Sequence, residues 1–147
     1  MDWVRKATGS AAVITDDRGR VLLLKRAYPP GDWVLPGGNA EADESPVGTV
    51  RREVREELGI ELEPERLTGV YYQADHPAGE FIHFVFRGAL DADAGIRIDP
   101  SEVAEHGFFE TDALPEPISP STRRRLTDGL REASLDLPLT LPPRSEP

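Results

Sequence analysis

The stretch GNAEADESPVGTVRREVREELGI, residues 38–60, decides the fold because it holds a helix complete with its start and end signals. Ser45 is a good N-cap residue, and Pro46 suits the first helical position because its ring already fixes φ there. Apolar residues then recur at spacings of three, four and four, in one stripe: Val47, Val50, Val54 and Leu58. Gly59 follows, where a left-handed residue commonly ends a helix. The sequence therefore predicts a helix over 46–58.

The other face of this helix carries three carboxylates. Glu53, Glu56 and Glu57 stand at i, i+3 and i+4, so their side chains project from one face. Like charges at this spacing repel, and a bound hard cation such as Mg²⁺, which takes oxygen ligands, would reverse that effect. Arg52 precedes Glu56 by four residues and can hold its carboxylate in one rotamer. Upstream, Gly37-Gly38 permits close backbone approach and can turn a carbonyl toward the same cation.

The charged residues of this helix also fit a solvated helix face with ion pairs. The spacing of the longer stretch bears on the choice between that alternative and a metal site. Gly38 is followed after five residues by Glu44, and Glu44 after seven by the run Arg52–Ile60. This matches G-x5-E-x7-R-E-U-x-E-E-x-G-U, with U aliphatic, at every specified position. At average residue frequencies, a chance match at a given start is on the order of one in a billion. The stretch thus resembles the Nudix box of the Nudix hydrolases.

The resemblance extends beyond the box, over residues 8–133. Upstream, the run Gly31–Gly38 looks like the usual approach to the box. Downstream, Glu102-Val103 with Phe108-Phe109 is similar to the family's late strand. Membership implies an α/β fold, an α/β/α sandwich with a central mixed β-sheet.

The resemblance also implies an activity, the Mg²⁺-dependent hydrolysis of a nucleoside diphosphate linked to another moiety, with Mn²⁺ as an alternative metal. It implies one set of metal ligands: the backbone carbonyl of Gly37 and the carboxylates of Glu53, Glu56 and Glu57. In this scheme Arg52 orients Glu56, and Glu44 is the partner that holds Arg52. The metal neutralises and orients the diphosphate and lowers the pKa of the attacking water.

The group that takes the proton from that water stays open. Nudix enzymes use a box glutamate, here Glu53 or Glu56, or a loop glutamate, here Glu102 or Glu105. If Val103 packs inward in an extended segment, Glu102 faces the cleft and Glu105 points with Val103 toward the core. This alternation favours Glu102, and both residues fit equally well as surface acids.

Several residues outside the box are candidates for the substrate cleft. Arg26, and less favourably Lys25, can hold a substrate phosphate, and a solubilising charge at a strand end explains Arg26 equally well. We expect His83 to be a structural or surface residue and Trp33 to pack beside the box. His76-Pro77 lies in a turn; a proline near there is seen in ADP-ribose-hydrolysing relatives, which the surrounding residues resemble only loosely.

The remaining elements follow from alternation and turn signals. Residues 11–15 and 21–24 predict a hairpin around the turn at Asp16–Gly19. Further elements are strands over 67–73, 81–87 and 103–109, the last broken at Gly107, and a helix over 120–133. A single domain over 1–134 and a proline-rich tail over 135–147, without helix or strand, complete the prediction.

Composition limits the partners. The 147 residues suffice for one domain, and 17 basic against 27 acidic residues give a charge of −10. Such an acidic chain is a poor ligand for a nucleic-acid polymer or an anionic membrane. The absence of cysteine excludes disulfides, thiolate zinc sites and cysteine nucleophiles. With no apolar run of membrane-spanning length and no secretory signal, we expect a cytoplasmic monomer or homodimer acting on a small-molecule diphosphate.

A non-catalytic Nudix module that binds a nucleotide-like ligand as a sensor or regulator is the alternative function. Such modules typically lose one or more box glutamates, and all are intact here. Hydrolysis measured with and without Mg²⁺ distinguishes the two. The box reads only the diphosphate, so the rest of the substrate depends on loops outside it.

Overall fold

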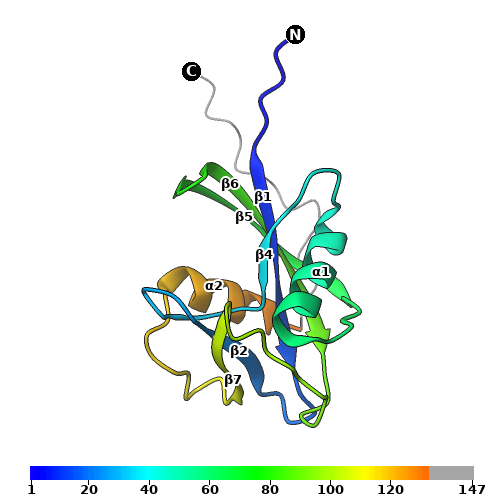
Figure 1. The fold of residues 1–147 in the computed structure, drawn as a ribbon, viewed down its shortest axis with the longest axis vertical. Coiled ribbons are helices and arrows are strands. Elements are labelled where there is room, and N and C mark those ends of the chain that lie inside the picture. The colour runs from blue at the N-terminus through cyan, green and yellow to red at the C-terminus, as the bar shows by residue number, and fades with distance from the viewer. Residues whose placement is uncertain (133–147) are drawn as a thin grey trace.

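The computed structural model describes residues 1–132, so the predicted tail over 135–147 lies outside the described residues. The elements follow in the order β1 (Ala7–Thr15), β2 (Val21–Arg26), β3 (Trp33–Val34), β4 (Gly37–Asn39), α1 (Pro46–Leu58), β5 (Arg66–His76), β6 (Gly79–Ala89), β7 (Val103–Phe109) and α2 (Pro120–Gly129). The predicted α/β class is confirmed, with a mixed sheet and two helices over the described range (Figure 1).

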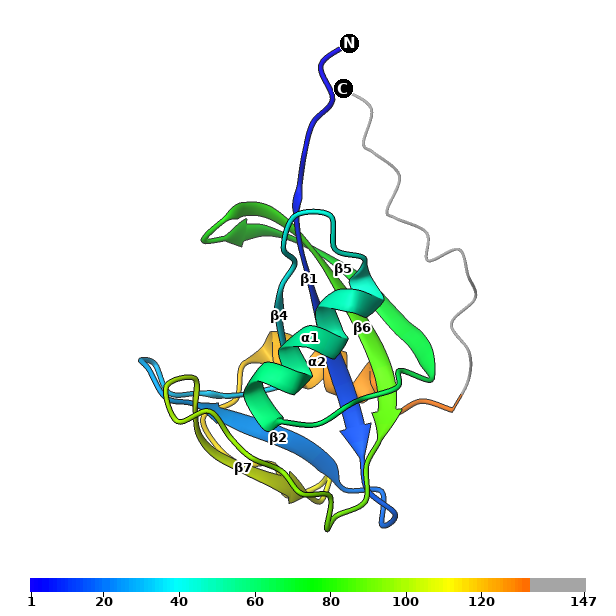
Figure 2. The same cartoon turned by 45° about the vertical axis from the view of Figure 1, so that its right-hand side comes forward.

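The sheet divides into two parts that meet at a single residue pair. In one part β1 runs parallel to β6 along its whole length, β6 pairs antiparallel with β5, and β4 pairs antiparallel with β1. In the other part β2 lies between β3 and β7, antiparallel to both. The parts are joined where Thr15 of β1 pairs with Val21 of β2. From this pair the two strands diverge, and we call the space between them the wedge (Figure 2).

The predicted hairpin of 11–15 with 21–24 is therefore wrong beyond its first pair. Its turn is built as the sequence indicates, since the Asp16 carboxylate accepts hydrogen bonds from the N–H groups of Arg18 and Arg20, each at 2.9 Å. The turn fixes only where the strands meet. Their longer pairings go to β6 and β7, which are distant in sequence, and local turn chemistry carries no information about those partners.

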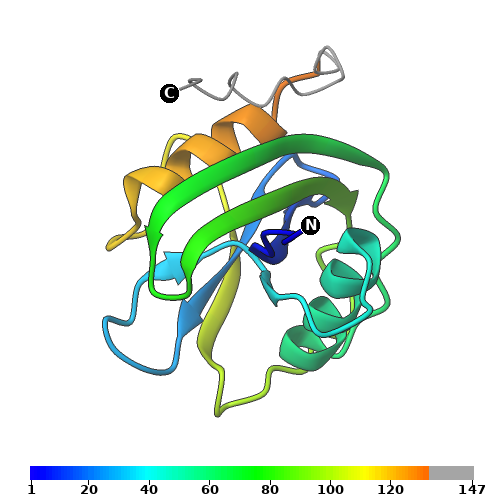
Figure 3. The ribbon, with the colours of Figure 1, turned by 90° about the horizontal axis from the view of Figure 1, so that it is seen from above.

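Two helices cover opposite faces of the part of the sheet that contains β1 (Figure 3). Side chains of β1 alternate between two cores: Ala12 and Ile14 pack in the core with α1, whereas Ala11 and Val13 pack in the core with α2. This arrangement explains why β1 is apolar on both faces. The expected α/β/α sandwich is confirmed.

Helix α1 begins and ends at the predicted residues. The Ser45 hydroxyl accepts a hydrogen bond from the Gly48 N–H at 3.0 Å. Gly59 takes the left-handed conformation at φ 65° and donates its N–H to the Arg55 carbonyl at 2.9 Å. Such a φ strains any residue with a Cβ, which makes glycine the natural end of this helix.

Other elements differ from their predictions in extent. The strands β1, β5 and β6 are longer than predicted, and β7 runs through Gly107 without a break. Helix α2 ends at Gly129 instead of 133, and Arg87 donates a hydrogen bond from Nη1 to the Gly129 carbonyl at 2.8 Å. Gly129 also packs closely on β1, where a Cβ would lie 2.5 Å from Cγ2 of Val13.

The apolar residues along α1 are buried to different degrees, so shortening them should lower the free energy of unfolding by different amounts. Val54 is fully buried, so Val54→Ala should lower the free energy of unfolding by about 2 kcal/mol through lost apolar burial and a cavity. Val47, only partly buried on the same stripe, is the control, and Val47→Ala should cost less than about 1 kcal/mol. Urea unfolding of both variants measures the difference. Equal losses would contradict this packing of α1.

Candidate active site

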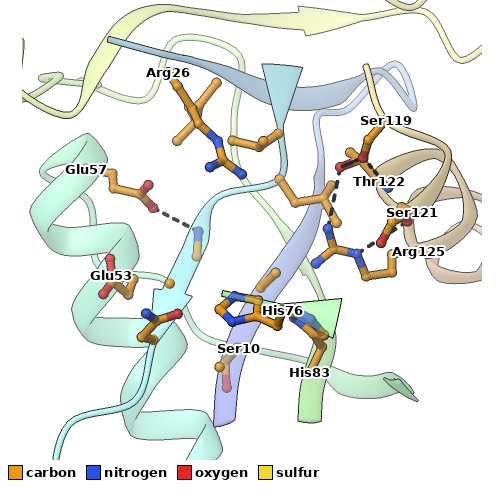
Figure 4. A pocket seen from close by; sticks show the side chains of 18 of the residues that line it. Ser10, Arg26, Glu53, Glu57, His76, His83, Ser119, Ser121, Thr122 and Arg125 are labelled. Carbon is orange, nitrogen blue, oxygen red and sulfur yellow. Dashed lines mark hydrogen bonds between the residues drawn. The ribbon is translucent and has the colours of Figure 1, made fainter. Parts of the chain in front are cut away.

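A cavity of about 650 Å³ opens in the wedge, a volume typical of small-molecule sites. Figure 4 shows side chains reaching it from α1 on one side and from α2 on the other, with the β5–β6 hairpin beside them. Its lining includes Arg26, Glu53, Glu57, His83, Glu102 and Arg125. Residues from across the chain thus meet at one place.

Two glycines let α1 approach the floor of the cavity. A Cβ on Gly38 would lie 2.4–2.6 Å from the carboxyl atoms of Glu53, so only glycine allows Glu53 to pack there. Gly37 has φ 152°, and a Cβ on it would lie 2.2 Å from the Ser10 carbonyl oxygen. Its N–H donates a hydrogen bond to Oε1 of Glu57 at 2.8 Å. Gly38 is therefore required by the contact of β4 with Glu53 of α1, and Gly37 by the contact of β4 with β1.

The three box carboxylates are placed differently with respect to solvent. Glu53 and Glu57 line the cavity, whereas Glu56 lies outside its lining with a side chain that is 55% exposed. Glu56 is held at the rim by Nη1 of Arg52, 3.1 Å from its Oε2.

Burial raises the pKa of both inner carboxyl groups. For Glu57 burial raises the pKa to about 8; the Gly37 N–H opposes this, and the charges of Glu53, Glu102 and Glu56 add to it. For Glu53 burial also raises the pKa, and the neighbouring guanidinium of Arg52 opposes it. Carboxylates crowded in a poorly hydrated site repel one another, and a cation among them would relieve this repulsion.

These residues fit a divalent cation in chemistry, although no three acidic or histidine side chains in residues 1–132 already converge as a ligand cluster. The reason is visible in the hydrogen bonds. Glu57 is turned to the Gly37 N–H, and Glu53 and Glu56 are turned to Arg52 at 3.0 and 3.1 Å. Oxygen donors of this kind are the ligands that Mg²⁺ takes. The metal-binding roles of Gly37, Glu53, Glu56 and Glu57 stay predictions.

Arg52 is the centre of a network larger than the predicted pair with Glu56. Its Nε and Nη2 donate to the two carboxylate oxygens of Glu44 at 2.7 and 3.1 Å, a bidentate pair. Nη2 also donates to the carbonyl of Asn39 at 2.8 Å. The hydrogen bonds from Arg52 lower the pKa of Glu44 to about 2, so this pair stays ionised and fixed. Arg52 thereby ties the loop before α1 to Glu53 and Glu56.

Glu102 borders the cavity, whereas Glu105 lies outside its lining. Glu102 lines the cavity just before the strand. Glu105 is exposed and faces Nζ of Lys25 at 3.6 Å, so the expectation that it points toward the core with Val103 is wrong. The reason is a β-bulge, since Lys25 pairs with Glu105 and Arg26 with Val103, which leaves Ala104 as an extra residue. The bulge breaks the alternation on which that expectation relied.

Arg26 lies at the cavity and Trp33 lies in the core, as the sequence predicts. Arg26 lines the cavity, and its Nε lies 3.3 Å from Oδ1 of Asp32 in a partly exposed ion pair. Its role toward a phosphate stays a prediction. Trp33 is buried and packs edge-on against Phe109 at a centroid distance of 5.0 Å, which confirms it as a packing residue.

The sequence analysis missed the wall formed by β5, β6 and α2. His83 is half-buried and lines the cavity with Nε2 2.8 Å from Oε1 of Gln73; burial, with the nearby charges of Arg125 and His76, lowers its pKa to about 4. His76 stacks on Phe81 at 4.0 Å between centroids. Alternation along β6 puts His83 and Phe81 on one face, and only the fold shows that this face borders a cavity.

Comparison with known proteins gives one consistent answer. The NUDIX domain family model matches residues 5–129. A MutT-like protein of Streptomyces ambofaciens is 36% identical over 120 residues, 82% of this chain and 74% of the relative. A protein of Methanocaldococcus jannaschii named ADP-ribose pyrophosphatase is 35% identical over 117 residues, 78% and 68% of the two chains. The crystal structure of a MutT NUDIX hydrolase from Burkholderia pseudomallei superposes with a TM-score of 0.74 at 33% identity, covering 85% of this chain and 98% of that one.

The network of Arg52 predicts a positioning effect. Arg52→Lys keeps the charge but loses the planar fork that binds Glu44 in a bidentate manner. We expect kcat to fall by about tenfold to hundredfold, as when a partner of a metal ligand is removed, while KM changes little. Steady-state kinetics with Arg51→Lys as the control, an exposed pair with Glu63, provide the measurement. A large rise in KM at constant kcat would instead mean that Arg52 contacts the substrate.

Substitutions of Glu102 and Glu105 should differ in their effect on kcat. Glu102→Gln should lower kcat by roughly 10²–10⁴-fold if Glu102 accepts the proton of the attacking water. Glu105→Gln, which only loses an exposed pair with Lys25, should leave kcat unchanged. Single-turnover rates of both variants test this. If both keep the rate of the unsubstituted enzyme, the proton acceptor is Glu53 or Glu56.

Proposed function

Because this chain belongs to the NUDIX family and is a hydrolase of diphosphate bonds, we propose that it cleaves a nucleoside diphosphate linked to another moiety in a reaction that requires Mg²⁺ or Mn²⁺. One observation supports this most directly. Glu53 and Glu57 line the same cavity as Glu102, and the mutual repulsion of these acids adds to the raised pKa of Glu57. A diphosphate enters such an acidic site only together with cations.

Each residue has a separate task in this proposal. Glu53, Glu56, Glu57 and the Gly37 carbonyl would hold the metal, which when bound neutralises the diphosphate and lowers the pKa of water. Arg52 positions Glu56 and Glu53 through the hydrogen bonds given above. Glu102, at the cavity and free of the ion pair that occupies Glu105, accepts the proton of the attacking water. Arg26 holds a phosphate oxygen of the substrate.

The substrate is a nucleotide or nucleotide derivative in this proposal. A relative that is 35% identical is named ADP-ribose pyrophosphatase, and ADP-ribose is therefore the first compound to assay. His76 and Pro77 also line the cavity. The turn that they form loosely resembles that of ADP-ribose-hydrolysing relatives, which is a second reason to assay ADP-ribose first. A panel of nucleoside triphosphates, dinucleoside polyphosphates and nucleotide sugars completes the comparison.

The other sequence predictions concern partners. Neither helix in the described part of the chain combines the length and apolarity needed to cross a membrane. The cavity volume suits a small molecule and not a polymer. A monomer or homodimer in the cytoplasm stays a prediction. Nothing in residues 1–132 favours the non-catalytic alternative, since Glu44, Glu53, Glu56 and Glu57 are all in place.

Removal of the metal or of its most buried ligand should stop the reaction. We expect hydrolysis to disappear with excess EDTA and to return with Mg²⁺ or Mn²⁺. Glu57→Gln should lower kcat by at least about 10²-fold, because it removes a ligand charge that the transition state needs. Phosphate or nucleotide release from the panel, followed with and without Mg²⁺, measures both effects.

Glu61→Gln is the matched control, since Glu61 is exposed just beyond α1 and pairs with Arg55. Its rate should equal that of the unsubstituted enzyme, and circular dichroism should show that the Glu57 variant keeps its helices. Full turnover by Glu57→Gln, or in EDTA, would refute the metal assignment.

A further inference from the structure

Helix α2 carries three consecutive arginines that differ in their surroundings. Arg123 pairs with Glu116, and Arg124 pairs with Asp128 at 2.9 Å. Arg125 has no acidic partner within residues 1–132. Among the described residues its guanidinium makes two long hydrogen bonds, from Nε to the Ser121 carbonyl at 3.3 Å and from Nη2 to the Thr122 hydroxyl at 3.4 Å.

Arg125 is also the one of the three that lines the cavity. In Figure 4 its guanidinium lies on the α2 side of the cavity, across from Glu53 and Glu57, with Arg26 near the top. A guanidinium has five N–H donors, and two weak bonds within its own helix leave the others unused. Because Arg125 lines the cavity, these donors are available to an anion that enters it.

Two neighbouring groups act on the charge of Arg125 in opposite directions. Burial lowers the pKa of its guanidinium, Tyr71 opposes this, and the positive charge of Arg26 adds to it. Arg125 in turn helps to lower the pKa of His83, so this imidazole is neutral and adds no further positive charge. Within residues 1–132, Arg125 is thus a positive charge without an acidic partner on the α2 side of the cavity, whereas the α1 side carries the carboxylates of Glu53 and Glu57. An anion beside Arg125 would pair with its free donors and relieve the repulsion from Arg26.

We propose that Arg125 binds a phosphate group of the substrate that is separate from the diphosphate being hydrolysed. This rests on the proposed function, since it places the scissile diphosphate at the α1 carboxylates and the second phosphate across the cavity. The enzyme would then select diphosphate compounds that carry an additional phosphate monoester on one of their two moieties. Selection of this kind comes from charge-assisted hydrogen bonds to a planar guanidinium.

The first test measures the anion site without any reaction. Inorganic phosphate is titrated into the metal-free full chain, and the Nε–H resonance of Arg125 is followed by ¹H–¹⁵N NMR together with Tm. We expect that resonance to shift and Tm to rise, with the rise reduced at least by half in Arg125→Gln. Arg123→Gln, with the neighbouring exposed arginine, should respond as the unsubstituted chain does. No shift at Arg125, or an equal rise of Tm in both variants, would overturn the proposal.

The second test measures selection. We compare kcat/KM for ADP-ribose with that for ADP-ribose 2′-phosphate, which differ by one phosphate monoester. The unsubstituted enzyme should prefer the phosphorylated compound by about tenfold to hundredfold, and Arg125→Gln should abolish this preference while it leaves ADP-ribose hydrolysis within about threefold. An equal loss on both substrates, or no preference to begin with, would contradict the proposal.

The two tests separate the two ideas. If phosphate shifts the Arg125 resonance but neither compound is hydrolysed, the proposed function fails and the anion site is supported. If both compounds are hydrolysed with Mg²⁺ and phosphate leaves Arg125 unaffected, the function stands and the anion site is refuted. If adenosine, which has no phosphate, shifts the resonance as much as phosphate does, Arg125 stacks on a base and the proposal is wrong.

Discussion

The single residue pair that joins β1 to β2 is the constraint on which the rest of the structure depends. Because Thr15 and Val21 pair and the strands then diverge, β1 is free to take β4 along its early residues and β6 along its whole length. The space left between the strands becomes the cavity. The lining of that cavity includes Arg26, Glu53, Glu57, Glu102 and Arg125.

Buried carboxylates in the wedge oppose folding, and the packing of α1 offsets them. Burial and like charges raise the pKa of Glu57, so its ionised form is destabilised in the folded chain. Val50, Val54 and Leu58, which are fully buried, and the two caps of α1 hold the helix in place against this repulsion. Arg52 adds a fixed positive charge at the edge of the cluster. These carboxylates are therefore held beside the cavity at a cost to stability, and within residues 1–132 they do not yet converge as a ligand cluster.

The features that the sequence predicts correctly depend mostly on interactions between residues close together in the chain. The bounds of α1 depend on Ser45, Pro46, the apolar stripe and Gly59, which all act within a few residues, and the prediction over 46–58 is confirmed. The family resemblance predicted the sandwich correctly. The hairpin prediction failed because the partners of β1 and β2 are distant in sequence. Glu105 was misplaced because Ala104 forms a bulge, which no alternation pattern reveals. Arg125 was missed because only the fold distinguishes it from Arg123 and Arg124.

Binding of Mn²⁺ to the full chain, followed by the electron paramagnetic resonance signal of the free ion, tests most directly whether the α1 carboxylates form a metal site. The account predicts that the chain removes the free-ion signal at a stoichiometry of at least one, that Mg²⁺ restores it by competition, and that Glu53→Gln weakens binding by at least about tenfold. A free-ion signal that the protein leaves unchanged, or binding that Glu53→Gln does not affect, would contradict it.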